Sequence, residues 1–167
     1  MAATEVFAMQ NPKETCTAAA FTWCHMKLGG RVTPRADLFL PSDETINVNM
    51  QNIRDHDNDP LAQAGIMGFV VTERSRGSVT YSSEQIAEIF KKNPGHVGIF
   101  WNSFHTMGYA YAHHDKEYFD NNVGLYKAKY TSGITAKMDS VQQAQRYGAW
   151  EGYLVLKLGN PHGMLTV

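Results

Sequence analysis

The chain has 167 residues, the size of one domain spanning residues 1–167, and 43% of them are hydrophobic, enough to build a core. Fifteen lysines and arginines against 16 aspartates and glutamates leave a net charge of −1, whereas nucleic-acid binders usually carry a basic excess or stripe. No apolar stretch reaches the roughly 18 residues of a membrane-spanning helix. We therefore expect no nucleic-acid or membrane partner, and a protein or small-molecule partner instead.

The first ten residues predict an extended segment without the basic region and apolar core of a secretory signal. If the protein leaves its cell, we expect export by a dedicated secretion machine or release from a larger chain. A helix is then expected, because Asn11 can cap it and Pro12 suits its first turn. The helical run from Thr15 to Leu28 ends at Gly29, a typical helix stop.

Residues 31–60 are rich in Pro, Asp and Asn and predict loops, with one short helix near residues 46–53. The acidic run at residues 55–59 is similar to the start of a calcium loop. However, Pro60 and Ile66 stand where such a loop needs glycine and glutamate. We interpret the run as a solvated acidic turn.

The second half of the chain predicts strands around two helices. Residues 68–72 form a short strand, and Ser82 with Gln85 forms a capping box for a helix ending near Lys92. Aromatic and β-branched stretches then alternate with turn residues, and they predict strands at 97–101, 106–111, 117–119 and 125–130. A helix over 136–147 and a strand over 153–158 complete the chain. Helices first and an antiparallel sheet afterwards indicate an α+β fold.

The chain has two cysteines, and their positions differ in chemical consequence. Cys16 lies near the predicted helix start, whereas Cys24 lies two turns further inside. The N-terminus of a helix and an imidazolium partner both stabilise a thiolate, the nucleophilic form of cysteine. Cys16 is therefore the better candidate nucleophile. The two thiols lie too far apart along one helix to form a disulfide.

A cysteine nucleophile needs a histidine base whose other nitrogen is held by a carboxylate or amide. His105 and Asp120 are 15 residues apart. A hairpin that turns near residues 112–113 brings them opposite or diagonal to each other, within about 8 Å between Cβ atoms. We therefore predict that His105 is the base and that Asp120 orients it.

Two sequence blocks carry a family resemblance. In the first, Cys16 is followed by Thr17 and Ala18, with Trp23 seven residues after it. In the second, His105-Thr-Met-Gly precedes the run Tyr-Phe-Asp-Asn-Asn-Val-Gly at residues 118–124. These blocks resemble the nucleophile helix and histidine strand of Yop T-type effector proteases, which are papain-like. The spacing from Asp120 to Gly124 is also similar to that of bacteriocin-processing peptidases, which cut after paired glycines.

The resemblance implies a papain-like fold, in which the nucleophile helix packs on an antiparallel β-sheet. It also implies a role for Gln10, six residues before Cys16, because papain-like enzymes use a glutamine at that distance in the oxyanion hole. A side-chain amide and a helix N–H are the donors that a developing oxyanion needs.

A second resemblance names a different base. The segment from Cys16 to Gly29 and the run Gly-His-Val-Gly-Ile-Phe at residues 95–100 are similar to NlpC-type cell-wall peptidases. On that interpretation His96 is the base and peptidoglycan is the substrate. No third residue follows His96 at the expected distance, whereas Asp120 follows His105, so His105 is preferred.

No cofactor or metal is implied. The adjacent His113 and His114, next to Asp115, point to opposite faces if they lie in a strand, so we interpret them as a hairpin tip.

We therefore expect a cysteine endopeptidase that uses Cys16, His105, Asp120 and Gln10. The resemblance implies a toxin or effector that cleaves a protein in the cytoplasm of another cell, and a producing bacterium would need a neutralising immunity protein. The same triad would also support deamidation or acyl transfer on a glutamine. A chain without activity would be a papain-like binding module.

Overall fold

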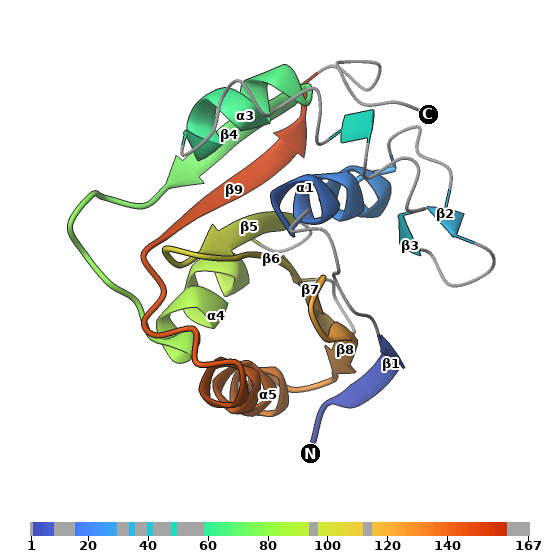
Figure 1. Ribbon diagram of the computed structural model, residues 1–167, viewed down its shortest axis with the longest axis vertical. Helices are drawn as coiled ribbons and strands as arrows, with labels where there is room; N and C mark the ends of the chain where they lie inside the picture. Colours follow the sequence, from blue (N-terminus) through green and yellow to red (C-terminus); the bar gives the residue numbers. More distant parts are fainter. Residues whose placement is uncertain are drawn as a thin grey trace.

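The computed structural model describes residues 2–8, 16–29, 34–35, 40–41, 48–49, 59–93, 97–111 and 115–159 (Figure 1). In chain order the elements are β1 (Thr4–Ala8), α1 (Cys16–Lys27), β2 (Pro34–Arg35), β3 (Leu40–Pro41), α3 (Pro60–Ile66), β4 (Phe69–Arg74), α4 (Ser83–Lys91), β5 (Val97–Trp101), β6 (Thr106–Tyr111), β7 (Lys116–Asp120), β8 (Gly124–Ala128), α5 (Thr131–Ala144) and β9 (Gly152–Leu158).

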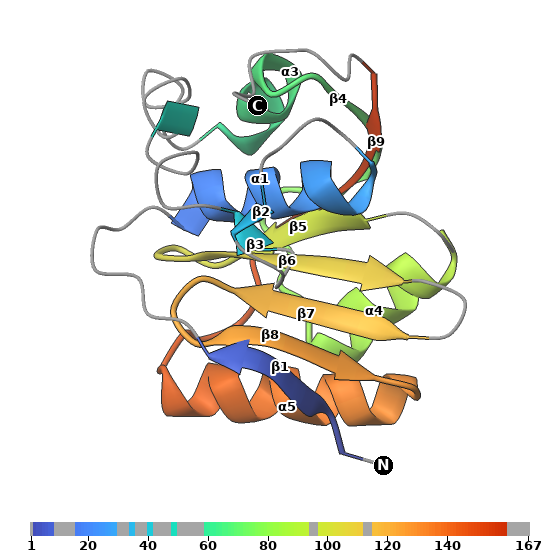
Figure 2. The same cartoon turned by 90° about the vertical axis from the view of Figure 1, so that its right-hand side faces the viewer.

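The described strands form one seven-stranded sheet in the order β1-β8-β7-β6-β5-β9-β4, with β2 and β3 paired separately. Every neighbouring pair in the large sheet is antiparallel. The strands from β5 to β8 follow one another as hairpins, and Figure 2 shows them stacked in that order. The predicted α+β class, with an antiparallel sheet, is confirmed.

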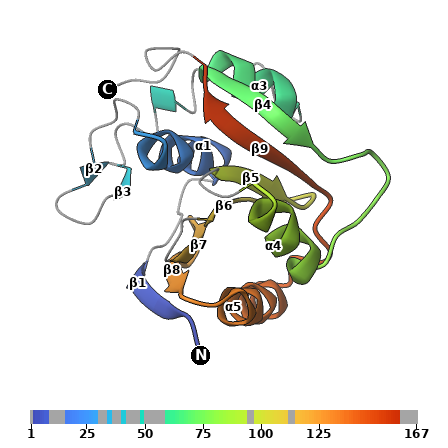
Figure 3. The same cartoon turned by 180° about the vertical axis from the view of Figure 1, so that it is seen from behind.

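Helices cover both faces of the sheet, α1 on one side and α4 with α5 on the other (Figures 1 and 3). Successive side chains of a strand point to opposite faces, so each strand serves two cores. Ile99 and Phe119 pack in the core that includes the residues of α1. Phe100 and Tyr118 pack in the core that includes residues of α4 and α5.

Helix α1 packs closely against the sheet because most of its side chains are apolar or small and a glycine of the sheet faces it. All side chains from Ala18 to His25 are buried, as expected for a helix with no polar face. Gly108 of β6 supplies room, since a Cβ there would lie 2.5 Å from the Trp23 ring. The helix stops at Gly29, whose φ of +83° is a left-handed conformation that favours glycine.

Most predicted elements of the second half are confirmed. The capping box of α4 is present, with Ser82 Oγ accepting from the Gln85 N–H at 3.1 Å and Gln85 Oε1 accepting from the Ser82 N–H at 2.8 Å. The prediction of α5 over residues 136–147 was wrong at both ends. Its N-cap residue, Tyr130, makes no capping hydrogen bond through its side chain, so the sequence carries no start signal there.

Helix α3 was not predicted: it begins at Pro60, the last residue of the predicted loops, and its other residues carried no prediction. Asp59 caps it by accepting from the Ala62 N–H at 3.2 Å. The other residues of the acidic run lie outside the described part. Of the helix predicted near residues 46–53, only Val48 and Asn49 are described, and both are helical. None of the described helices is long and apolar enough to cross a membrane.

Candidate active site

Cys16 is the first residue of α1, so its side chain belongs to the first helical turn, at the positive end of the helix dipole. The side chain is half-buried. Thr17 lies 4.0 Å from its sulfur and forms a 3.1 Å hydrogen bond with Thr106 of β6. At the other end of α1, Lys27 forms an ion pair with the buried Glu117 of β7. Helix α1 is thereby fixed to the strands beneath the thiol.

His105 ends the short turn between β5 and β6, and Asn102 builds that turn. The Asn102 Oδ1 accepts the backbone N–H groups of Phe104 and His105, both at 2.8 Å. The backbone N–H of Asn102 donates to the His105 carbonyl at 3.0 Å. An asparagine side chain that binds the backbone two and three residues on is a common way to fix a tight turn. The backbone of His105 is therefore held from both sides.

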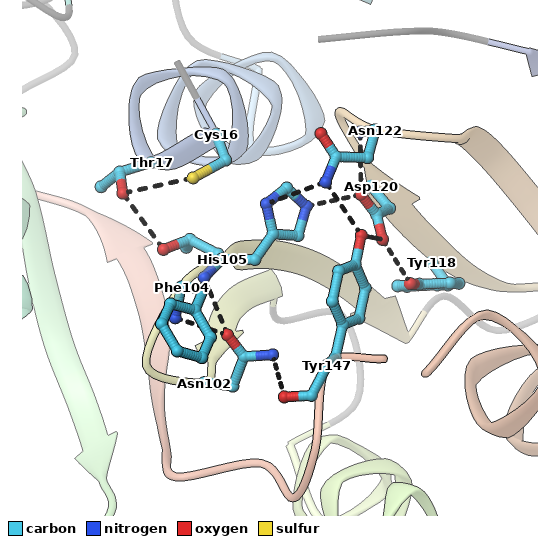
Figure 4. Close-up of polar contacts among 10 residues, drawn as sticks. Cys16, Thr17, Asn102, Phe104, His105, Tyr118, Asp120, Asn122 and Tyr147 are labelled. Atoms are coloured by element: carbon cyan, nitrogen blue, oxygen red, sulfur yellow. Dashed lines mark hydrogen bonds and ion pairs between the residues drawn. The ribbon is translucent and has the colours of Figure 1, made fainter. Parts of the chain in front are cut away.

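The imidazole of His105 lies between Cys16 and Asp120 (Figure 4). Its Nε2 is 2.6 Å from Asp120 Oδ1, which leaves Nδ1 on the side of Cys16. In the register of β6 and β7, Gly108 pairs with Phe119, so Asp120 comes opposite Met107, diagonal to His105. Of the two placements expected from the hairpin, opposite or diagonal, the structure has the diagonal one.

Asp120 is fully buried, and its two oxygens accept several hydrogen bonds. The hydroxyls of Tyr118 and Tyr147 donate to Oδ2 at 2.7 and 2.8 Å. The Asn122 N–H donates to Oδ1 at 2.9 Å, beside His105. A buried carboxylate needs such donors to offset its lost hydration. Because both oxygens are held, the carboxylate cannot rotate away from His105.

The surroundings of Cys16 and His105 favour a thiolate paired with an imidazolium. Burial would raise the pKa of the Cys16 thiol, but the hydrogen bond and positive charge of His105 outweigh it and bring that pKa below its usual value. Burial would lower the pKa of His105, but the hydrogen bond and charge of Asp120, with the contact to Cys16, raise it to about 9. Both shifts favour the thiolate form of Cys16 and the imidazolium form of His105 over the neutral pair.

A cleft of about 310 Å³ opens beside Cys16 and His105. The turn between β5 and β6 forms one wall, where Phe104 is 84% exposed. Glu151 also lines the cleft and accepts a hydrogen bond from Ser103 of that turn. The other described lining residues are Thr17, Pro60, Gln63, Trp101, Asn102 and Thr106. The cleft therefore reaches the Cys16 side chain.

The structure thus brings together Cys16, His105 and Asp120. Gln10 and His96 lie outside the described residues, as do His113 and His114, so their predicted roles stay predictions. The sequence analysis assigned no role to four residues that hold the site: Asn102, Tyr118, Asn122 and Tyr147. Asn102 follows a predicted strand and begins a turn, which is a readable signal. Tyr147 lies 27 residues beyond Asp120 and carried no signal.

Comparisons with known proteins give one informative result. No family model and no curated protein matches the sequence. Among solved structures 13 chains match, and one is the Pseudomonas avirulence protein AvrPphB. It is 15% identical, with a TM-score of 0.60, and the match covers 95% of this chain and 97% of that chain. The likeness shows the fold, and it confirms the prediction: papain-like α+β, with the helix that begins at Cys16 packed on an antiparallel sheet.

Proposed function

We propose that this protein is a cysteine endopeptidase that hydrolyses a peptide bond of a target protein. The Cys16 thiolate attacks the carbonyl carbon, and the protonated His105 then gives its proton to the leaving amine. The neutral imidazole then takes a proton from a water molecule that attacks the acyl group. The acid is released, and the thiolate–imidazolium pair of Cys16 and His105 is restored. Asp120 orients the imidazole. Gln10 and the Cys16 N–H are proposed to stabilise the oxyanion, as the resemblance to papain-like enzymes implies.

The observation that carries the proposal is the pairing of Cys16 with His105 at the mouth of the cleft. The pKa of this thiol is lowered by the imidazole, which is in turn held by Asp120 at 2.6 Å. Among the described residues no imidazole is paired with the buried thiol of Cys24, and burial raises its pKa. A thiolate with access to a substrate and an acid for the leaving group are the two requirements of acyl transfer.

We also propose that the protein is a toxin or effector that acts in the cytoplasm of another cell. The resemblance to Yop T-type effectors supports this, as does the fold likeness to an avirulence protein. A bacterium that makes such a protease would need an immunity protein against it.

The test is a comparison of new protein N-termini in a cell lysate by mass spectrometry. The lysate is treated with wild-type protein or with Cys16→Ala. We expect at least one N-terminus that appears only with the wild type. Glutamine deamidation without any new N-terminus would contradict a protease and support the deamidase alternative. Identical lysates would contradict both activities.

Expression in two bacterial compartments separates the protease from a cell-wall hydrolase. We expect growth inhibition from the cytoplasm that Cys16→Ala abolishes. Toxicity confined to the periplasm would contradict the proposal, since peptidoglycan is reached only there.

A further inference from the structure

Tyr147 lies in the segment between α5 and β9 and stacks on His105 (Figure 4). The two ring centroids are 4.9 Å apart, and the ring planes make an angle of 24°. The tyrosine is buried, with 8% of its surface exposed. It comes from neither strand of the hairpin that carries His105 and Asp120. A separate part of the chain therefore closes one face of the imidazole.

Both ends of Tyr147 are fixed to residues that also hold His105. Its hydroxyl donates to Asp120 Oδ2 at 2.8 Å and accepts from Asn122 Nδ2 at 3.1 Å. Its backbone carbonyl accepts from Asn102 Nδ2 at 2.7 Å. Asn102 is the residue that holds the His105 backbone, and Asp120 is the partner of its ring. The two stacked rings are thus clamped in one framework.

The charges around the two stacked rings favour a protonated His105 imidazole above the Tyr147 ring. The imidazole is faced by Cys16 from α1 and by Asp120 from β7, and Tyr118 of β7 adds its hydroxyl behind Asp120. Burial and the nearby charge of Asp120 raise the pKa of Tyr147, so its hydroxyl stays protonated as a donor. A protonated imidazole over an aromatic face gains cation–π energy that the neutral imidazole lacks. Stacking therefore favours the charged form.

We propose that Tyr147 is a positioning residue for His105, whose ring holds the imidazole in line with Asp120 and stabilises its protonated form beside the Cys16 thiolate. This inference rests on the proposed function, because it concerns the same pair of groups. Tyr147 contacts His105 and Asp120 rather than the reacting atoms, so it acts through them. Its effect is to lower the pH at which Cys16 becomes reactive.

The test is the rate of Cys16 alkylation by iodoacetamide as a function of pH, which needs no substrate. Tyr147→Met removes the ring and fills most of its space, and Tyr147→Phe restores a ring. We expect Tyr147→Met to raise the midpoint of the profile by about half to one pH unit. Tyr147→Phe should bring it back towards the wild-type value. Tyr130→Met, a change at a half-exposed tyrosine outside the site, should leave it unchanged.

Pentafluorophenylalanine in place of Tyr147 keeps the test decisive if Tyr147→Met fails to fold. Fluorination reverses the charge distribution of the ring with little change of shape. We expect a higher midpoint than for Tyr147→Phe. If the pentafluorophenylalanine variant and Tyr147→Phe have the same profile, or if folded Tyr147→Met keeps the wild-type midpoint, the role of Tyr147 is overturned. The proposed function would stand in either case. If wild-type Cys16 reacts no faster than Cys24 at pH 6, the proposed function falls and this inference with it.

Discussion

Cys16 and Cys24 lie on the same helix, yet their surroundings shift their pKa values in opposite directions. Cys24 is fully buried in the core, where its thiol donates to the Gly98 carbonyl at 3.3 Å, and burial raises its pKa. Cys16 sits at the helix start beside His105, and its pKa is lowered. The ranking of the two cysteines needed only the predicted helix start, so the sequence could supply it.

We expect iodoacetamide at pH 6 to alkylate Cys16 well ahead of Cys24, because only Cys16 has a stabilised thiolate. His105→Ala removes both the hydrogen bond and the charge that lower this pKa. The variant should therefore need a higher pH for the same alkylation rate. Mass spectrometry of the two cysteine peptides measures both effects. Preferential labelling of Cys24 would contradict the assignment of Cys16 as the nucleophile.

At the scale of elements, strands were easier to predict than helix starts. β5 and β6 were predicted with the bounds that they have, because aromatic and β-branched residues alternate with turn residues there. Helix α3 and the start of α5 were missed. Asp59 and Pro60 are a cap and a first-turn proline, but the acidic run before them masked this signal. Tyr130 offers no cap at all.

Helix α1 also carries His25, a buried histidine that packs against the Phe69 ring with centroids 5.6 Å apart. Neither ring nitrogen has a hydrogen-bond partner in the described part of the chain. Burial lowers the pKa of His25 below the usual 6.5. Below pH 6.5 the unfolded chain therefore binds a proton that the folded protein excludes, and stability falls as the pH falls.

We expect His25 to lower the free energy of unfolding between pH 7.5 and pH 5.5, by up to about 1.4 kcal/mol in total. His25→Leu removes the titrating group while keeping an apolar side chain of similar size. The variant should lose less stability over the same range. Urea denaturation of both proteins at the two pH values measures the difference. Equal losses would show that the acid sensitivity arises elsewhere.

At the scale of the whole molecule, the site joins parts of the chain that only the fold brings together. α1 supplies Cys16, the turn after β5 supplies His105, and the end of β7 supplies Asp120. The His105–Asp120 pair could be predicted because one hairpin places both residues. Tyr147 could not, because its position depends on how α5 packs across the sheet. The place of Asn102 in a turn could be predicted, but the bond from its amide to the Tyr147 carbonyl could not, for the same reason.

Cys16, His105 and Asp120 act on one proton and one sulfur, so their contributions to the rate should not add. We expect Cys16→Ala and His105→Ala each to lower the rate of peptide cleavage by roughly 10³-fold or more, and the double variant to be little worse than either. Asp120→Ala should cost less, since a loosely held imidazole keeps some basicity. The measurement is cleavage of the peptide bond identified in the lysate, with thermal melts to confirm folding. Losses that multiply in the double variant would mean that Cys16 and His105 act independently and do not form a catalytic pair.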